Sequence, residues 1–269
     1  MRSRPSPPAR SPRRPPARRP PAQTSWEPVA NWYRGHLREE DSLLRSVVYP
    51  QTLRMLGPCS GERVLDVACG EGSFAELLAR ADAIVTGIDA SPALIRQAEQ
   101  KRIPHATFHV ADARQFTLPG APYAAAVCLL ALQNIDPMAG MFRATAAALR
   151  PGAPLVVVMN HPCFRIPRQS SWGWEEQRQL QYRRIDRYLA PLRVPIQAHP
   201  GARPGVTTVS FHRPLSQIVA AGAAAGFTIH ALEEWTSNRA SDSGPRARAE
   251  NRARMEIPMF LAFRAVRAA

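Results

Sequence analysis

Apolar runs of strand length alternate with stretches of helical spacing along residues 63–160. The run from Arg63 to Ala68 is rich in β-branched residues and too short for a helix, so it predicts a buried strand. From Phe74 the apolar residues recur at helical spacing, which predicts a helix. Strands and helices that alternate in this way are typical of βαβ units, and therefore of a parallel sheet with helices on its faces.

The same rhythm predicts further strands. Four of them complete the alternating part, and a strand-like segment and two final strands follow, with a long polar hairpin excursion over 237–255. The predicted ranges are 83–88, 106–110, 123–130, 155–159, 206–212, 227–235 and 259–266.

Residues 161–206 interrupt the alternation. Trp172 and Trp174 precede a polar stretch that we interpret as a helix over about 175–189. The insertion leaves the fifth strand at the edge of the sheet where ligands of α/β proteins bind. We therefore expect a cap or lid that contributes to specificity, with a solvated surface helix as the alternative.

The N-terminal part differs in composition from the rest. Residues 1–25 are mostly Arg, Pro, Ser and Ala without an acidic residue, so we expect a disordered tail, and 26–269 to form one domain. The seven arginines of this tail supply half of the net charge of +14, so the tail could bind nucleic acid or another polyanion electrostatically. An extension without a function is an equal alternative. Residues 26–57 read as a helical cover that Pro50 breaks or kinks.

Composition also limits the location and the metal content. No apolar stretch follows Arg13-Arg14 and no run reaches the ~20 apolar residues of a membrane span, so we expect neither export nor a span. The four cysteines lack ligand-like spacing, which favours a reduced, cytoplasmic protein without a structural metal.

A glycine turn between the first strand and the first helix carries the candidate chemistry. Gly70 and Gly72 let the backbone approach a nucleotide closely, and Asp89, at the tip of the second strand, can accept hydrogen bonds from ribose hydroxyls. The spacing fits a dinucleotide fingerprint too. However, Asp66 would repel a pyrophosphate, whereas the ammonium and sulfonium of S-adenosylmethionine suit an anion. A turn without a ligand is the remaining alternative.

The run Asp66-Val67-Ala68-Cys69-Gly70-Glu71-Gly72 resembles the first motif of class I S-adenosylmethionine-dependent methyltransferases. The chain past residue 60 follows their layout and is similar to the small-molecule enzymes of the ubiquinone/menaquinone-biosynthesis group. This resemblance implies an α/β fold: a doubly wound, mostly parallel, Rossmann-like sheet of seven strands, with a terminal antiparallel hairpin and a cap insertion after the fifth strand.

The resemblance also implies S-adenosylmethionine as cofactor. It places Asp112 beside the adenine amino group, where a simple Asx turn is the alternative, and lets the N-terminal helix cover the cofactor, with Tyr33 as either a contact or a core residue. The expected cofactor-binding residues are Tyr33, Asp66, Ala68, Cys69, Gly70, Gly72, Asp89, Ala90, Asp112, Ala113 and Leu130.

The implied reaction is an in-line displacement, in which an O, N or C nucleophile of a small molecule takes the methyl group. Aromatic and arginine side chains in the insertion favour an aromatic or anionic acceptor. His161 and His212 are candidate bases because they follow strands at the expected edge, although loop histidines that cap the backbone are the alternative. A methyltransferase acting on RNA or protein through the basic tail, and a non-catalytic S-adenosylmethionine-binding protein, remain as other functions.

Overall fold

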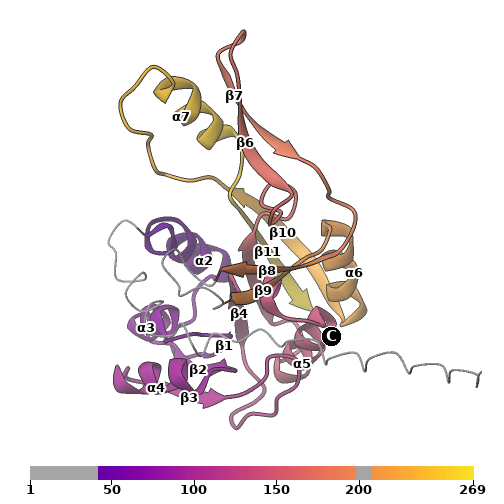
Figure 1. Cartoon of the computed structure of the whole chain (residues 1–269). Coiled ribbons are helices and arrows are strands. Elements are labelled where there is room, and N and C mark those ends of the chain that lie inside the picture. The colour runs from indigo at the N-terminus through magenta and orange to yellow at the C-terminus, as the bar shows by residue number, and fades with distance from the viewer. Residues whose placement is uncertain (1–41, 198–206) are drawn as a thin grey trace, which may run out of the picture.

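The computed structural model describes residues 42–197 and 207–269; the predictions for residues 1–25, for the cover before residue 42 and for Tyr33 lie outside this part. Its centre is a seven-stranded sheet in the order β10-β11-β5-β4-β1-β2-β3 (Figure 1). The predicted α/β fold with a terminal antiparallel hairpin is confirmed, because β1 to β5 run parallel and β11 runs antiparallel to both β5 and β10. The strands are β1 Arg63–Val67, β2 Ile84–Asp89, β3 Ala106–Val110, β4 Ala125–Leu129, β5 Pro154–Asn160, β10 Phe227–Trp235 and β11 Phe260–Arg267.

Helices cover both faces of the sheet and bury two apolar layers. Successive strand residues alternate between the layers, so that Val64 packs in one and Leu65 in the other, and both are fully buried. Burial of such a side chain stabilises the fold by about 1.5–3 kcal/mol. The first layer lies under α2 (Tyr49–Leu56), α3 (Ser73–Arg80) and α4 (Pro92–Gln100), and the second under α5 (Met138–Ala148) and α6 (Leu215–Ala224).

The expected break at Pro50 is a change of helix type. A π-helical segment, Leu44–Val48, passes directly into α2, and Pro50 lies in the first turn of α2. Proline lacks a backbone N–H and its ring crowds the preceding turn, so it interrupts the regular hydrogen bonding of an α-helix, and the change of helix type lies directly before it.

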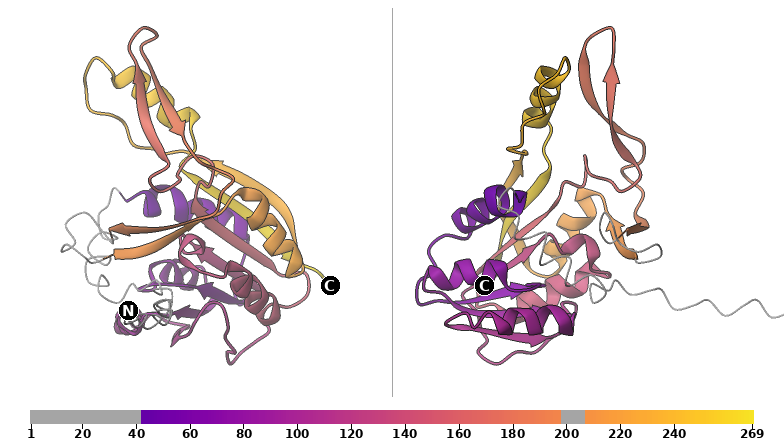
Figure 2. Two further views of the ribbon diagram at one scale, coloured as in Figure 1. Left: turned by 45° about the vertical axis from the view of Figure 1, so that its right-hand side comes forward. Right: turned by 60° about the vertical axis from the view of Figure 1, so that its left-hand side comes forward.

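The helix predicted over 175–189 is wrong. The segment forms an antiparallel hairpin of β6 (Ser170–Glu175) and β7 (Leu180–Ile185) that projects from the sheet (Figure 2). Exposure alternates with a period of two along 181–185, which is the strand pattern, whereas no helical apolar stripe supports a helix. Gly173 faces the ring of Tyr182, which fills the space of a side chain at position 173.

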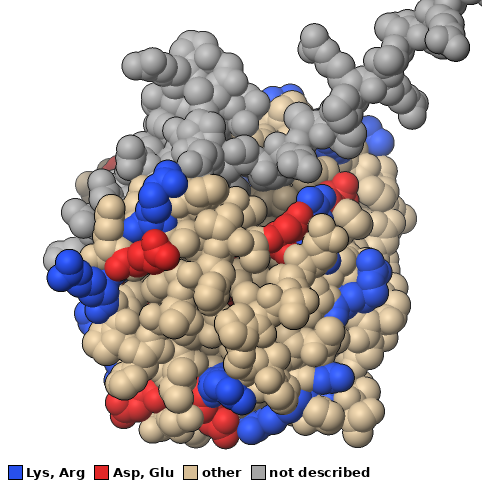
Figure 3. Space-filling view, turned by 90° about the horizontal axis from the view of Figure 1, so that it is seen from below, with Lys and Arg blue, Asp and Glu red and all other residues tan. Residues whose placement is uncertain are grey.

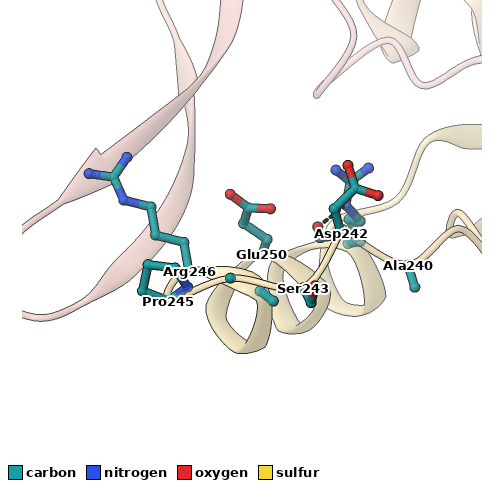
Figure 4. A pocket seen from close by; sticks show the side chains of 10 residues that line it. Ala240, Asp242, Ser243, Pro245, Arg246 and Glu250 are labelled. Carbon is teal, nitrogen blue, oxygen red and sulfur yellow. Dashed lines mark hydrogen bonds between the residues drawn. The ribbon is translucent and has the colours of Figure 1, made fainter.

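The excursion between β10 and β11 contains a helix that the sequence did not predict, α7 (Ala247–Glu256). Arg246 connects it to the β6–β7 hairpin, since its guanidinium lies 4.6 Å from the ring centre of Trp174 and 3.6 Å from the Glu176 carboxylate. Asp242 and Glu250 point to the same side at the start of α7, where a cavity of about 390 Å³ opens (Figure 4). We call the β6–β7 hairpin together with α7 the arm.

A second hairpin, β8 (Leu192–Gln197) with β9 (Thr207–His212), lies beside the short helix Leu132–Asn134 that follows β4. The predicted strand over 206–212 is thereby confirmed. Among the helices of the two described ranges, each is too short or too polar to cross a bilayer. Within the same ranges there is no cluster of His, Cys, Asp and Glu suited to a metal, and the four cysteines are free thiols.

Candidate cofactor and acceptor site

The glycine loop after β1 is tied to the end of β2. The Gly70 N–H donates to Oδ2 of Asp89 over 3.0 Å, and the Ser91 N–H donates to Oδ1 over 2.9 Å. Gly72 needs to be glycine because its φ is +79° and an added Cβ would meet Phe108 at 3.0 Å. Asp89 therefore orients the glycine loop through these two hydrogen bonds. Its expected hydrogen bonds with the ribose hydroxyls of the cofactor remain a prediction.

Asp66 is a buried carboxylate that lacks part of its hydrogen bonding. Its side chain is 2% exposed, and its Oδ2 has no partner within the described ranges. Burial, and then the charge of Asp89, raise the pKa of Asp66 to about 7. An unpaired buried acceptor is costly, so a cationic donor such as an ammonium group would stabilise this site.

A second unpaired acceptor lies at the end of the neighbouring strand β4. Nε2 of Gln133 donates to the Leu130 carbonyl over 2.6 Å, which leaves Oε1 buried without a partner among the residues described. The sequence prediction missed Gln133. These two protein oxygens can accept hydrogen bonds from the ammonium or amino groups of a ligand. A pyrophosphate has only acceptor oxygens and would need hydrogen-bond donors from the protein instead.

Backbone strain marks the same edge of the sheet. Ala68 and Leu130, which follow β1 and β4, have φ values of +59° and +52°. Non-glycine residues in this region cost about 1–3 kcal/mol and gather at ligand sites. Both were expected at the cofactor, and the parallel strands β1 and β4 bring them together.

The remaining cofactor candidates differ in their surroundings. Burial first, and then the charges of Asp66 and Asp89, raise the pKa of the Cys69 thiol well above its ordinary value, so the thiol stays protonated at neutral pH. Ala90 is exposed after β2, and Ala113 is buried after β3. Their expected contacts with the cofactor stay predictions.

Asp112 forms the Asx turn that was the alternative to its adenine role. Its Oδ1 accepts from the Arg114 N–H over 2.9 Å, and the Arg114 guanidinium binds both oxygens at 2.5–3.0 Å. These hydrogen bonds hold the pKa of Asp112 below its usual value. Carboxylate lone pairs remain for a further donor, so the adenine role stays a prediction.

A buried ion pair that the sequence prediction missed supports the glycine loop. Glu71 is 3% exposed; its carboxylate pairs with the ammonium of Lys101 and accepts from the Ser73 hydroxyl, which also accepts from Lys101 over 3.2 Å. Lys101 follows α4 directly, so the pair connects the loop to the end of that helix.

We expect Lys101→Met to lower the free energy of unfolding by about 1–3 kcal/mol, because it leaves the Glu71 charge buried without its cation. Urea unfolding measures the change. The double variant Glu71→Gln/Lys101→Met removes the charge as well and regains much of the loss. Equal stability of the single variant and the parent would show that the pair does not stabilise the loop.

His161 lies at the end of β5 with both ring nitrogens in hydrogen bonds. Its side chain is 2% exposed; Nδ1 accepts from the Cys163 N–H over 3.2 Å, and Nε2 lies 2.6 Å from Oε1 of Glu234. Since Nδ1 accepts, Nε2 carries the proton and donates to Glu234. Burial lowers the pKa of His161, while Glu234 partly opposes this shift. Glu234, missed by the sequence prediction, is half exposed and presents the pair to solvent.

His212, at the end of β9, is buried against Tyr188. Its Nε2 donates to the Tyr188 carbonyl over 2.6 Å, and the two rings lie 5.9 Å apart. Burial raises the pKa of the Tyr188 hydroxyl, as does its hydrogen bond with the Cys163 side chain. The two predicted histidines are thus brought together through Tyr188 and Cys163. The contact with a backbone carbonyl gives His212 a role in holding Tyr188.

Asp66 makes the affinity for a cationic ligand dependent on pH. With a pKa of about 7, the carboxylate is protonated at low pH and must lose that proton to pair with an ammonium group. We expect the affinity for S-adenosylmethionine to be about tenfold weaker at pH 6 than at pH 8. Calorimetry across this range checks it, with Asp66→Asn as the variant in which the dependence disappears. A flat profile in the parent protein would contradict the role of Asp66.

Comparisons with known proteins agree with this geometry. A family model for a methyltransferase domain matches residues 64–152. The chain is 35% identical over 112 residues to a demethylmenaquinone methyltransferase of Tropheryma whipplei, a match that covers 40% of this chain and 46% of that protein. It is 36% identical over 104 residues to a ubiquinone biosynthesis O-methyltransferase of Xylella fastidiosa, covering 37% and 42%. The chain spans less than half the length of these curated relatives.

A solved structure matches over a longer range. An S-adenosylmethionine-dependent methyltransferase from Mesorhizobium loti superposes with a TM-score of 0.66 at 29% identity, over 81% of this chain and 96% of that one. Its similarity extends past the methyltransferase-domain match at 64–152. The sheet order, the glycine loop and these relatives agree: residues 64–152 match a methyltransferase domain, and the chain has the fold of the class I S-adenosylmethionine-dependent methyltransferases.

Proposed function

We propose that the protein transfers a methyl group from S-adenosylmethionine to an O, N or C nucleophile of a small molecule. The observation that carries this proposal is the buried Asp66 carboxylate beside the glycine loop, whose Oδ2 has no partner among the described residues; it suits a cationic cofactor and opposes a pyrophosphate. S-adenosylmethionine supplies, when bound, a methyl group on a sulfonium, which is a good leaving group. Positioning and exclusion of water are then the main tasks of the chain.

Residues of the chain can also hold the proton that an acceptor loses. His161 is buried and neutral at pH 7, and its Nε2–H fixes the Glu234 carboxylate. Glu234 is half exposed, so an acceptor hydroxyl or amine can reach it. In our proposal the acceptor's proton passes to the Glu234 carboxylate. His161, whose two ring nitrogens are already in hydrogen bonds, holds that carboxylate in place through its Nε2–H, so the base role expected for His161 passes to Glu234.

The face seen in Figure 3 favours a small molecule over a nucleic acid as the acceptor. On the face seen in Figure 3, acidic and basic side chains are interspersed around a broad uncharged area. A nucleic-acid site on that face would need a basic stripe. The names of the curated relatives point to quinone-related acceptors, so phenols and quinols are the first acceptors to test.

Methyl-labelled S-adenosylmethionine tests the proposal directly. The full chain is incubated with a set of phenols, quinols and amines, and separately with total RNA and with denatured protein. We expect label in a small-molecule acceptor. Label in RNA or protein alone would contradict the proposed acceptor class. Tight cofactor binding with no transfer to any of the three classes would indicate a non-catalytic binding protein.

A further inference from the structure

Three arginines from separate segments gather where the arm meets the sheet. Arg165 lies one turn after His161, Arg183 lies on β7 and Arg254 lies on α7. The charges of Arg183 and Arg254 are close enough to Arg165 to lower its pKa, in addition to the larger effect of burial. We call these three residues the arginine cluster.

Hydrogen bonds fix two members of the cluster in place. The Arg183 guanidinium donates to the Phe164 carbonyl over 2.8 Å and to the Ser170 hydroxyl over 2.9 Å. It also lies 5.1 Å from the ring centre of Trp172. The Arg254 Nε donates to the Ser241 hydroxyl over 3.1 Å. Two of the three arginine side chains, Arg183 and Arg254, are therefore held in place by hydrogen bonds to neutral groups.

No carboxylate within the described ranges pairs with the cluster, although neighbouring arginines have such partners. Arg184, the next residue on β7, pairs with Asp186 over 2.6 Å, and Arg246, at the start of α7, pairs with Glu176 over 3.6 Å. Like charges held close in a half-buried place destabilise the fold unless an anion offsets them. Arginines held by neutral groups bind carboxylates and phosphates well because their planar forks match those anions.

The cluster shares one turn of chain with His161, which holds the proposed base Glu234. The Arg165 N–H donates to the His161 carbonyl over 2.8 Å, and the ring of Phe164, between them in sequence, lies 4.8 Å from the His161 ring. An acceptor that spans this turn would have its anionic group at the arginines and its nucleophile toward His161.

We propose that the arginine cluster binds the carboxylate or phosphate group of a small methyl acceptor and so sets the acceptor class as anionic. Trp172 and Phe164 supply flat apolar surfaces beside the cluster for the body of that acceptor. This inference rests on the proposed function for its role in catalysis, but the anion site itself is testable without the cofactor.

The test measures binding of benzoate, phenyl phosphate, inorganic phosphate and uncharged benzamide to the full chain by calorimetry. We expect saturable binding of at least one anion, no binding of benzamide, and about a tenfold loss of affinity in Arg165→Gln and in Arg183→Gln. Comparison of benzoate with phenyl phosphate distinguishes a carboxylate from a phosphate. The matched control is Arg184→Gln, on the same strand but already paired, which keeps the parent affinity.

Thermal unfolding gives a second measurement on the same variants. Without an anion, Arg165→Gln raises the melting temperature because it relieves repulsion; phosphate then stabilises the parent more than the variant. The proposal is overturned if no anion binds, if the arginine variants bind as the parent does, or if Arg165→Gln lowers the melting temperature. Cluster-dependent binding of a short oligonucleotide, without binding of the small anions, also overturns it.

Affinity for S-adenosylmethionine, measured on the same samples, separates the two claims. If the parent protein binds an anion at the cluster but does not bind S-adenosylmethionine, the proposed function is refuted and the anion site is not. Normal cofactor binding without an anion site would refute only the present inference.

Discussion

His161→Ala is expected to lower the rate of methyl transfer about tenfold or more at pH 7, because it removes the Nε2–H that holds the Glu234 carboxylate, the proposed base. The affinity for S-adenosylmethionine stays near that of the parent, because the hydrogen bonds of the imidazole go to Glu234 and Cys163 and not to the glycine loop. Glu234→Gln lowers the rate by about 10²–10⁴-fold, the usual contribution of a general base. His230→Ala changes an exposed histidine on the same strand as Glu234 and serves as the control.

The pH–rate profile separates a histidine that holds the base from a purely structural one. Burial lowers the pKa of His161 below its ordinary value of 6.5, so the imidazole is neutral at pH 7 and becomes protonated only in more acidic solution. The positive charge that it then gains makes the neighbouring Glu234 carboxylate a weaker base, so the parent rate falls as the pH decreases through that pKa, and this step disappears in His161→Ala. A loss under tenfold with the same acidic step in the variant would show that His161 does not act on Glu234.

Asp89→Ala is expected to weaken the binding of S-adenosylmethionine about ten- to hundredfold. The variant loses hydrogen bonds between a carboxylate and the ribose, which together are worth about 1.5–3 kcal/mol. It also frees the Gly70 N–H, which Asp89 holds at 3.0 Å, so the glycine loop is less well ordered before binding. Calorimetry measures the effect.

Asp89→Asn is the matched variant, because it keeps the shape and one acceptor oxygen but removes the charge. We expect it to fall between Asp89→Ala and the parent. Unchanged affinity in Asp89→Ala would mean that the ribose does not lie against β2.

The strands and the glycine turn could be predicted because their signals are local. A buried strand followed by glycine and a helical stripe, as around Asp66 and Gly70, is encoded within about a dozen residues. The doubly wound sheet of seven strands and its terminal antiparallel hairpin were predicted only through the family resemblance. The polar 175–189 stretch gave no periodic apolar signal, so its hairpin was missed, and so was α7.

The contacts that complete the site join residues far apart in the chain. Glu234 lies 73 residues after His161 and is placed beside it by the antiparallel pairing of β10, β11 and β5. The charge of Arg254 comes near Arg165 because α7 packs beside β7. The residue types at these positions suit a surface equally well, so the sequence alone could not single them out.

Calorimetry of the full chain with S-adenosylmethionine and, separately, with NAD tests the central claim most directly. Both ligands carry an adenosine that Asp89 could hold. S-adenosylmethionine offers an ammonium donor to Oδ2 of Asp66, which has no partner among the described residues, whereas NAD brings a pyrophosphate that this carboxylate repels. The account predicts saturable one-to-one binding of S-adenosylmethionine and no measurable binding of NAD at pH 8. Tight binding of NAD, or no binding of S-adenosylmethionine, would contradict it.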